Sequence, residues 1–146
     1  MSTYSFLNIN ATIAGPGIVT NLAAGASAAE EGITIEASED KNVMTIGADG
    51  KGQHSLVASD ACTLTVRLLK ISPVNQLLMA AYDLQSASSA LWGQNIITIT
   101  DSARNDFTAI QACAFKKKPT ITYAKEGGMM EWTFDGIKAT SVLGNG

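Results

Sequence analysis

The chain has 146 residues, of which 46% are hydrophobic and 16% are charged, and its net charge is −3 at pH 7. A chain of this length forms one core, so residues 1–146 are expected to fold as a single domain, and the negative charge argues against binding to a phosphate backbone. The charged fraction is well below the roughly 25% of a typical soluble protein, which favours a subunit whose flanks are covered by copies of itself.

Two segments of different character open the chain. Apolar and polar residues alternate from Leu7 to Ile13, which predicts a half-buried strand, and Ala14-Gly15-Pro16-Gly17 ends it. From Ile18 to Gly32 the sequence is irregular and rich in small residues, so a long loop and a short helix both fit. We interpret it as a loop that orders against a neighbour, because loops of this length in compact domains are usually functional; local disorder is the alternative.

Short β-strands dominate the next part of the chain. Runs at 33–37 and 43–46 lead to Asp49-Gly50, a strong hairpin-turn signal, and a returning strand is expected through Ser55–Val57. The strict alternation from Cys62 to Leu68 is the clearest strand signal in the chain. The sequence therefore predicts a long hairpin with a glycine-rich tip, followed by a half-buried strand.

One helix is predicted in mid-chain, at about residues 73–88. Ser72 is suited to cap the first free N–H groups and Pro73 suits the first helical position, and the helix is expected to end before Gly93. The apolar stripe that should pack on a sheet consists of Val74, Leu77, Leu78, Ala81 and Leu84. The side chains expected to face water or a partner are Asn75, Gln76, Asp83 and Gln85.

The last third of the chain returns to β character. Strands are predicted at 95–100, 107–115 and 120–123, with a turn at 125–128 and a closing β region at 130–142 that places Trp132 and Phe134 on one side. The order of strands, one helix and strands lacks the βαβα alternation of a parallel sheet. The predicted fold is mainly β: a two-sheet β-sandwich or barrel with one flanking α-helix.

The sequence offers little for catalysis. His54 is the single histidine and lies beside a glycine-rich turn, so an exposed loop residue is the simpler interpretation. Cys62 and Cys113 lie far apart within apolar stretches, which predicts buried thiols and no metal site. Gly47–Gly52 lacks the spacing of a phosphate-binding loop and is interpreted as a hairpin tip. We therefore expect no enzyme, no cofactor and no metal.

A short basic run, Lys116-Lys117-Lys118-Pro119, is the one cluster of positive charge. No aromatic stacking platform is evident beside it, so a solvated turn or an ion-pairing patch against an acidic neighbour is favoured over nucleic-acid binding. Glu30-Glu31 and Glu39-Asp40 are the obvious acidic counterparts, and the sequence does not settle whether they meet it.

The N-terminus and the hydropathy pattern bear on location. Met1–Ser5 contains no basic region that leads into an apolar one. No apolar run reaches the roughly 20 residues that a membrane span requires. We therefore expect a protein that is made and kept in a cytoplasm, without a membrane partner.

Four features taken together resemble a known family over the whole length of the chain. They are the alternating strand Tyr4–Asn10, the Asp49-Gly50 hairpin, the helix that begins at Pro73 and the closing β region that ends near Gly146. In size, composition and element order the chain resembles a tail-tube subunit of contractile-tailed bacteriophages and tailocins, without a diagnostic short motif. The resemblance implies a structural virion protein whose hexameric rings join by edge-to-edge strand pairing and stack into the inner tube of the tail, the channel for DNA delivery.

The resemblance also implies partners, a location and contact residues. The subunit would contact copies of itself and the tail sheath protein, while tape-measure protein and viral DNA pass through a mostly polar or acidic lumen without specific binding. It would be part of the virion, assembled in the cytoplasm of the bacterial host. In this family a protruding hairpin and the terminal segments make the ring-to-ring contacts. That role is carried over to Gly47, Ala48, Asp49, Gly50, Lys51, Gly52, Gln53 and His54, with Tyr4, Phe6 and the segment from Ala14 to Glu31.

Three other interpretations stay open. A type VI secretion tube protein would form similar rings inside another machine. A virion-borne binding module, such as a carbohydrate- or receptor-binding jelly roll, normally needs exposed aromatic side chains, yet aromatics make up 6% of the chain, and Trp92 and Trp132 lie next to apolar runs where core packing is favoured. For a small β-barrel enzyme, no nucleophile, base or metal set can be assembled.

Overall fold

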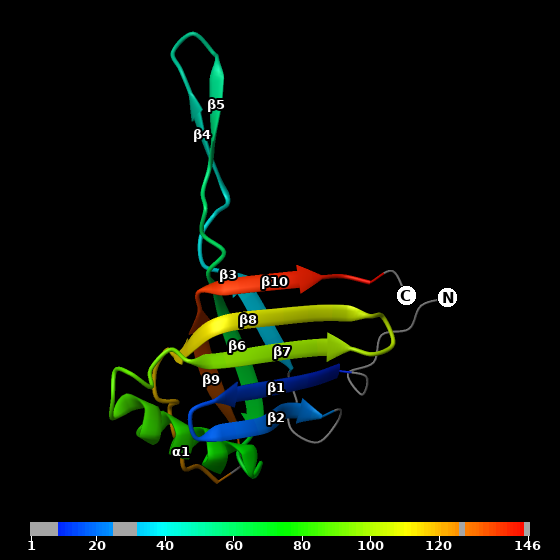
Figure 1. Cartoon of the computed structure of the whole chain (residues 1–146), viewed down its shortest axis with the longest axis vertical. Coiled ribbons are helices and arrows are strands. Elements are labelled where there is room, and N and C mark those ends of the chain that lie inside the picture. The colour runs from blue at the N-terminus through cyan, green and yellow to red at the C-terminus, as the bar shows by residue number, and fades with distance from the viewer. Residues whose placement is uncertain (1–8, 25–31, 126–127, 145–146) are drawn as a thin grey trace.

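A computed structural model of the chain describes residues 9–24, 32–125 and 128–144. Within these ranges the chain forms ten strands and one helix, as shown in Figure 1. The strands before the helix are β1 Ile9–Gly15, β2 Ile18–Ala24, β3 Ile33–Ala37, β4 Asn42–Ile46, β5 Gly52–Leu56 and β6 Cys62–Leu69. The helix is α1 Val74–Ser86, and after it come β7 Asn95–Asp101, β8 Asp106–Phe115, β9 Met129–Gly136 and β10 Lys138–Val142.

The body of the molecule is a sandwich of two antiparallel sheets that share one strand. The first sheet has the order β2-β1-β7-β8-β10 and the second has the order β8-β9-β6-β3. The strands of the first sheet cross those of the second in Figure 1. The predicted fold, mainly β with two sheets and one flanking helix, is confirmed.

A bulge in β8 lets this strand serve both sheets. Ile110 pairs with Ile97 of β7, but the next recorded pair joins Cys113 to Asn95, so β8 has one residue more than β7 over this stretch. Ala112 takes up the extra residue with a φ of +53°. Beyond the bulge, β8 pairs with β9 through Phe115 and Phe134. Bulges of this kind bend a strand and increase its twist, which carries β8 from one layer into the other.

The core lies between the sheets and is built by the alternation that the sequence predicted. The four apolar residues at alternate positions of β6 from Cys62 to Leu68 are buried, as are Trp132 and Phe134 of β9. Phe115 lies at the centre, with its ring centroid 4.8 Å from that of Phe134 and 5.9 Å from that of Trp132. Aromatic pairs at such distances stabilise a core beyond their buried area. Trp92 is partly buried against this cluster, so both tryptophans pack as expected.

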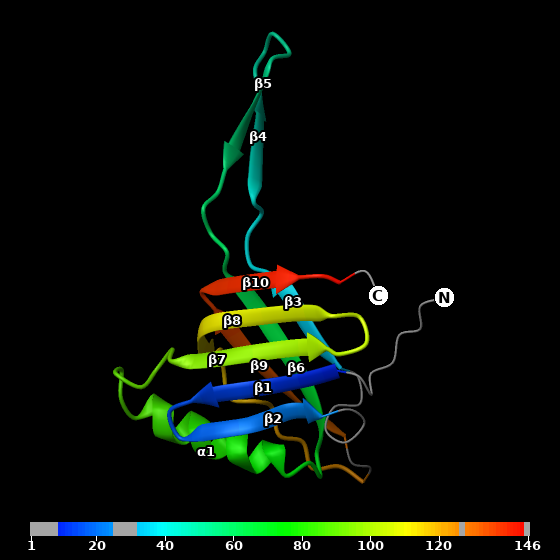
Figure 2. The ribbon, with the colours of Figure 1, turned by 45° about the vertical axis from the view of Figure 1, so that its right-hand side comes forward.

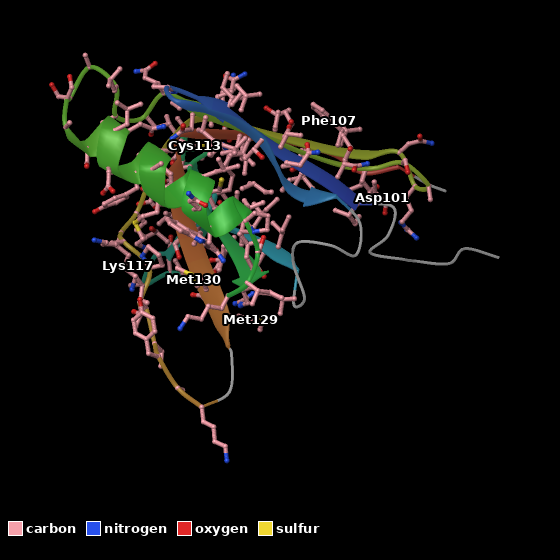
Figure 3. All side chains as sticks on the ribbon, turned by 90° about the horizontal axis from the view of Figure 1, so that it is seen from below. Asp101, Phe107, Cys113, Lys117, Met129 and Met130 are labelled. Atoms are coloured by element: carbon pink, nitrogen blue, oxygen red, sulfur yellow. The ribbon has the colours of Figure 1, made fainter. Side chains whose placement is uncertain are left out.

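Helix α1 packs at the end of the sandwich beside β2, below the sheets in Figure 1 and in front of them in the view from below in Figure 3. It ends at Ser86, earlier than the predicted Ser88, and the Ser72 hydroxyl accepts a hydrogen bond from the Val74 N–H at 3.4 Å. The predicted inward face is wrong in part. Leu78 and Ala81 are buried, but Leu77 and Leu84 are about half exposed, and Asn75 and Gln85 are buried where exposure was expected.

Hydrogen bonds explain why the two amides are inside. The indole N–H of Trp132 donates to Asn75 Oδ1 at 2.9 Å, and Asn75 Nδ2 donates to the Leu69 carbonyl at 2.8 Å. Gln85 and Asn95 form a reciprocal amide pair, at 2.9 and 2.8 Å. A buried polar group is stable once its hydrogen bonds are made, so these amides orient the helix on the sheets.

Two other predictions need correction, and a third is refined. Ile18–Gly32 was interpreted as a loop, but residues 18–24 form β2, which pairs with β1 across a tight turn where Gly17 has a φ of +79°. Residues 120–123 form no strand. The closing β region predicted at 130–142 is confirmed, and it consists of two strands, β9 and β10, of which β10 pairs with β8. In each case the pairing partner, which the local pattern does not reveal, decides the structure.

Candidate assembly interface

The β4–β5 hairpin stands away from the body of the molecule as an arm (Figures 1 and 2). The two strands pair with each other from Asn42↔Leu56 to Ile46↔Gly52 and form a sheet of their own. Every described side chain from Asn42 to His54 is exposed. An arm that touches so little of its own chain is available to contact another molecule.

The tip of the arm is held by its own backbone. The Gly47 N–H donates to the Lys51 carbonyl at 2.8 Å, and the Lys51 N–H donates to Asp49 Oδ1 at 3.1 Å. Gly50 has a φ of +86°, a conformation that suits glycine. The predicted Asp49-Gly50 turn is therefore confirmed, and His54 lies on β5 just past the tip.

The two faces of the arm differ in polarity. Side chains alternate between the faces of a strand, so one face carries Met44, Ile46 and Leu56, which are 60%, 56% and 82% exposed. His54 shares this face, and its Nδ1 accepts a 3.1 Å hydrogen bond from Nδ2 of the Asn42 side chain. The other face carries Val43, Thr45, Gln53 and Ser55. Large apolar side chains on a thin projection indicate a contact surface.

The base of the arm is fastened to the body. Lys41 Nζ lies 3.0 Å from Asp60 Oδ1, and the Val57 N–H donates to the Lys41 carbonyl at 2.8 Å. The backbone of Asp60 also forms an isolated parallel β-bridge with Lys138 at the start of β10, where the Ala139 N–H donates to the Asp60 carbonyl at 3.0 Å. These contacts fix where the arm leaves the body, next to the β10 edge of the first sheet.

The first sheet ends in two edge strands. They are β2 at the end beside α1 and β10 at the end beside the arm. Among the described residues no strand pairs with their outer sides, and Asp60 occupies only the start of the β10 edge, at Lys138 and Ala139. An edge strand presents free N–H and C=O groups that can pair with another chain. The sheet can therefore be extended at both ends by further copies.

The outward face of the first sheet is almost free of charge. Phe107 lies on this side, away from α1, in Figure 3. By the strand registers the face comprises Asn10, Thr12, Ala14, Val19, Asn21, Ile96, Thr98, Thr100, Phe107, Ala109, Gln111, Lys138, Thr140 and Val142. The second sheet differs, since its outward face carries the Arg67–Glu131 ion pair, at 3.2 Å, and Asp135.

Helix α1 presents an exposed apolar stripe that sequence analysis missed. Leu77 and Leu84 are 47% and 46% exposed. They belong to an exposed row at spacings of three and four residues, which we call the α1 stripe: Pro73, Leu77, Ala80, Leu84 and Ala87. Residues so spaced lie along one side of a helix. The spacing was a signal available in the sequence, but both leucines had been assigned to the core.

Several predicted contact residues cannot be placed. Tyr4 and Phe6 lie outside the described residues, and so does the part of the Ala14–Glu31 segment after Ala24. Lys116, Lys117 and Lys118 are exposed on the segment after β8. No ion pair recorded between described residues joins them to Glu39 or Asp40, and Glu30-Glu31 falls in the undescribed part.

The cysteines lie inside the sandwich, as predicted. Both thiols are buried and free, and both lie close to Gly136. Burial, with the nearby Cys62 thiol as a second cause, raises the pKa of Cys113 to about 12. A thiol with a raised pKa stays protonated and unreactive at neutral pH. Among the described residues no three His, Cys, Asp or Glu side chains gather as a metal site would require.

Hydropathy adds one observation. In the part of the chain that the structure describes, α1 is too short and too polar to span a bilayer.

Comparisons with known proteins agree with this geometry. No curated protein matches the chain. Among solved structures, the tube-terminating cap of the anti-feeding prophage has a TM-score of 0.57 at 10% identity, over 98% of this chain and 93% of that one. The sheath–tube complex of an extracellular contractile injection system, PVC, has a TM-score of 0.54 at 10% identity, over 94% and 89%. These likenesses show a shared fold. The family model of the bacteriophage PhiTE tail tube protein matches residues 1–144, so the chain belongs to this family of tail tube proteins.

Proposed function

We propose that this tail tube protein forms hexameric rings that stack into the inner tube of a contractile tail and enclose the channel for DNA delivery. One observation carries the proposal: among the described residues no strand pairs with the outer side of β2 or with that of β10 beyond Ala139, at opposite ends of the first sheet, and a long arm leaves the body beside β10. A surface that meets a different surface on the next copy generates rings or filaments. The protein is a structural part, and its function requires no catalytic residue.

Within a ring, the β10 edge of one copy joins the β2 edge of the next. At each junction, backbone N–H and C=O groups that are hydrogen-bonded to water in an isolated subunit form hydrogen bonds with the neighbouring strand. Closing a sheet into a cylinder removes its edges altogether. The subunits thus contribute their first sheets to one continuous wall.

The outward face of the first sheet lines the channel. Its side chains are Thr, Asn, Gln and apolar residues, and Lys138 is the one charged member among those described. DNA binding depends largely on positive charge that neutralises phosphates. A neutral wall with little positive charge lets viral DNA and tape-measure protein pass without specific binding. The charged face of the second sheet is then on the outside, where a tail sheath protein would bind.

Ring-to-ring contacts are made by the arm, above all by Gly47–His54 at its tip and at the start of β5. The N-terminal residues Tyr4 and Phe6 belong to the same proposal. The particle is a virion tail, assembled in the cytoplasm of the bacterial host.

A second candidate function is the tube of a contractile injection device that is not a phage. The solved structures with a similar fold are a cap and a sheath–tube complex of such devices. A type VI secretion tube is the related alternative. These devices share rings and stacking, so the same experiment tests the common part of both proposals.

Negative-stain electron microscopy of the purified chain over a range of concentrations tests this function. We expect rings or tubes with a central channel, together with a sedimentation coefficient that rises with concentration. A strict monomer at the highest concentration would overturn the proposal. Isolated rings that never stack would support lateral pairing and refute stacking by the subunit alone.

A further inference from the structure

Helix α1 has two apolar sides, and the body of the molecule covers one of them. Leu78 and Ala81 face the core and are fully buried or nearly so. The α1 stripe faces away, with Leu77 and Leu84 at its centre. Leu84 leans over the β1–β2 turn at Gly17, and its outer side stays exposed. A surface helix normally has one apolar side, so the second side points to a partner.

The arm has an apolar face that no other part of the described chain covers. This face carries Met44, Ile46 and Leu56. The Ile46 side chain extends over Gly52, and its Cδ1 lies 3.0 Å from the position that a Cβ would occupy there. A two-stranded hairpin is marginally stable by itself in water and needs packing on one face. The arm is therefore expected to be covered in the assembled state.

The two surfaces lie at opposite ends of the molecule, the arm at one end and α1 at the other (Figures 1 and 2). They cannot meet within one chain, but they can meet between two chains. We propose that the apolar face of the arm docks on the α1 stripe of a neighbouring copy. This inference deepens the proposed stacking function and rests on the premise that the arm contacts another subunit.

The dimensions of the two surfaces agree. The five residues of β4 span about 16 Å at the usual strand rise, and the α1 stripe from Pro73 to Ala87 spans about 21 Å at the helical rise. Neither apolar face contains a charged side chain, and Asp83 is the one charged residue of α1. Contact therefore removes apolar area from water without burying an ion.

The inclination of the arm to the tube axis favours a receiving helix in the adjoining ring over one in the same ring. In Figure 1 the arm extends away from the body beyond β10, crosswise to the direction of the strands of the first sheet. Strands in a closed barrel tilt by about 35–45° from the axis, so an arm directed crosswise to them is inclined to the axis as well. Such an arm reaches partly around the ring and partly along the tube. Each copy then gives one arm to the next ring and receives one from the previous ring.

Disulfide cross-linking between engineered cysteines tests the contact. The double variant Ile46→Cys/Leu84→Cys is assembled, imaged, oxidised mildly and run on a non-reducing gel. We expect a ladder of dimers, trimers and longer species that collapses on reduction, because each copy carries one arm and one receiving helix. The native Cys62 and Cys113 are buried and should add no background.

Matched variants isolate the geometry. Thr45→Cys/Leu84→Cys moves the arm thiol to the opposite face and should give at least tenfold less cross-linked product. Either single variant should give no ladder. A strong dimer band from Ile46→Cys alone would mean that arms pair with each other and would overturn the proposal.

The outcomes distinguish a failure of the arm-on-helix contact from a failure of the proposed tube function. The arm-on-helix contact would be overturned if the double variant forms normal tubes but gives no ladder, while the cysteine at position 84 still reacts with a maleimide reagent. That result would leave the tube function intact. The α1 stripe would then be available to a sheath protein. A wild-type chain that forms no tubes would overturn the tube function itself, and this inference with it.

Discussion

Gly15 occupies a position where a side chain has no room. A Cβ there would collide with Asn95 Oδ1, the atom that accepts from Gln85 Nε2 at 2.9 Å. We predict that Gly15→Ala lowers the free energy of unfolding by about 2–4 kcal/mol, because the methyl displaces a buried amide from its partners. Urea unfolding of the unassembled chain measures this loss. Gly128→Ala, which meets no atom within 4 Å, is the control and should change stability little.

Because of Cys113, the free energy of unfolding is expected to depend on pH in the alkaline range. Burial raises its pKa to about 12 from an ordinary value of 9.0, so the thiol ionises in the unfolded chain before it ionises in the folded one. The stabilisation is complete below pH 9 and is lost as the pH rises from 9 toward 12. The expected slope from this group is up to about 1.4 kcal/mol per pH unit. Urea unfolding across this range should show a shallower slope for Cys113→Ala; equal slopes would contradict the assignment.

At the scale of elements, the bulge in β8 joins the two sheets. Ala112 holds a φ of +53°, which an alanine adopts only with strain. We predict that Ala112→Gly stabilises the unassembled chain by about 0.5–1 kcal/mol, since the relieved strain exceeds the entropy cost of glycine. Ala109→Gly, in the regular part of β8, should instead destabilise by about 0.5–1 kcal/mol. Chemical denaturation of both variants measures the two changes in unfolding free energy. Equal losses of stability in the two variants would refute the strain argument.

The elements that the sequence predicted well are those with a strong local signal. Alternation from Cys62 to Leu68 and the Asp49-Gly50 turn specify β6 and the arm without knowledge of the rest of the fold. The existence of α1 was predicted for the same reason. Its orientation was not, because Asn75 is satisfied by Trp132, which lies far along the chain, and no local pattern contains that pairing.

In the candidate interface, too, the parts with a local sequence signal could be predicted and the parts that depend on distant partners could not. The tip of the arm could be located from its turn residues, and the apolar face of β4 and β5 could have been read from their alternation. The α1 stripe was missed because Leu77 and Leu84 fit a core pattern equally well. Strand β2 was missed because its small residues resemble a loop and its partner β1 is what makes it a strand.

At the scale of the whole molecule, the arm and the body are separable. The arm adds no residue to the buried core. We predict that a variant in which residues 42–56 are replaced by a short turn keeps the unfolding free energy of the body within about 0.5 kcal/mol and loses tube growth. Circular dichroism with urea and electron microscopy measure the two effects. Normal tubes from this variant would show that the arm has no part in stacking.

A cryo-electron microscopy reconstruction of the assembled chain tests the central claim most directly. The account predicts hexameric rings in which first sheets join edge to edge into one cylinder, with the Thr12 and Thr98 side of that sheet toward the channel and each arm against an adjoining ring. A map with the Arg67–Glu131 face of the second sheet lining the channel would contradict it. So would rings whose subunits meet without any contact between β2 and β10.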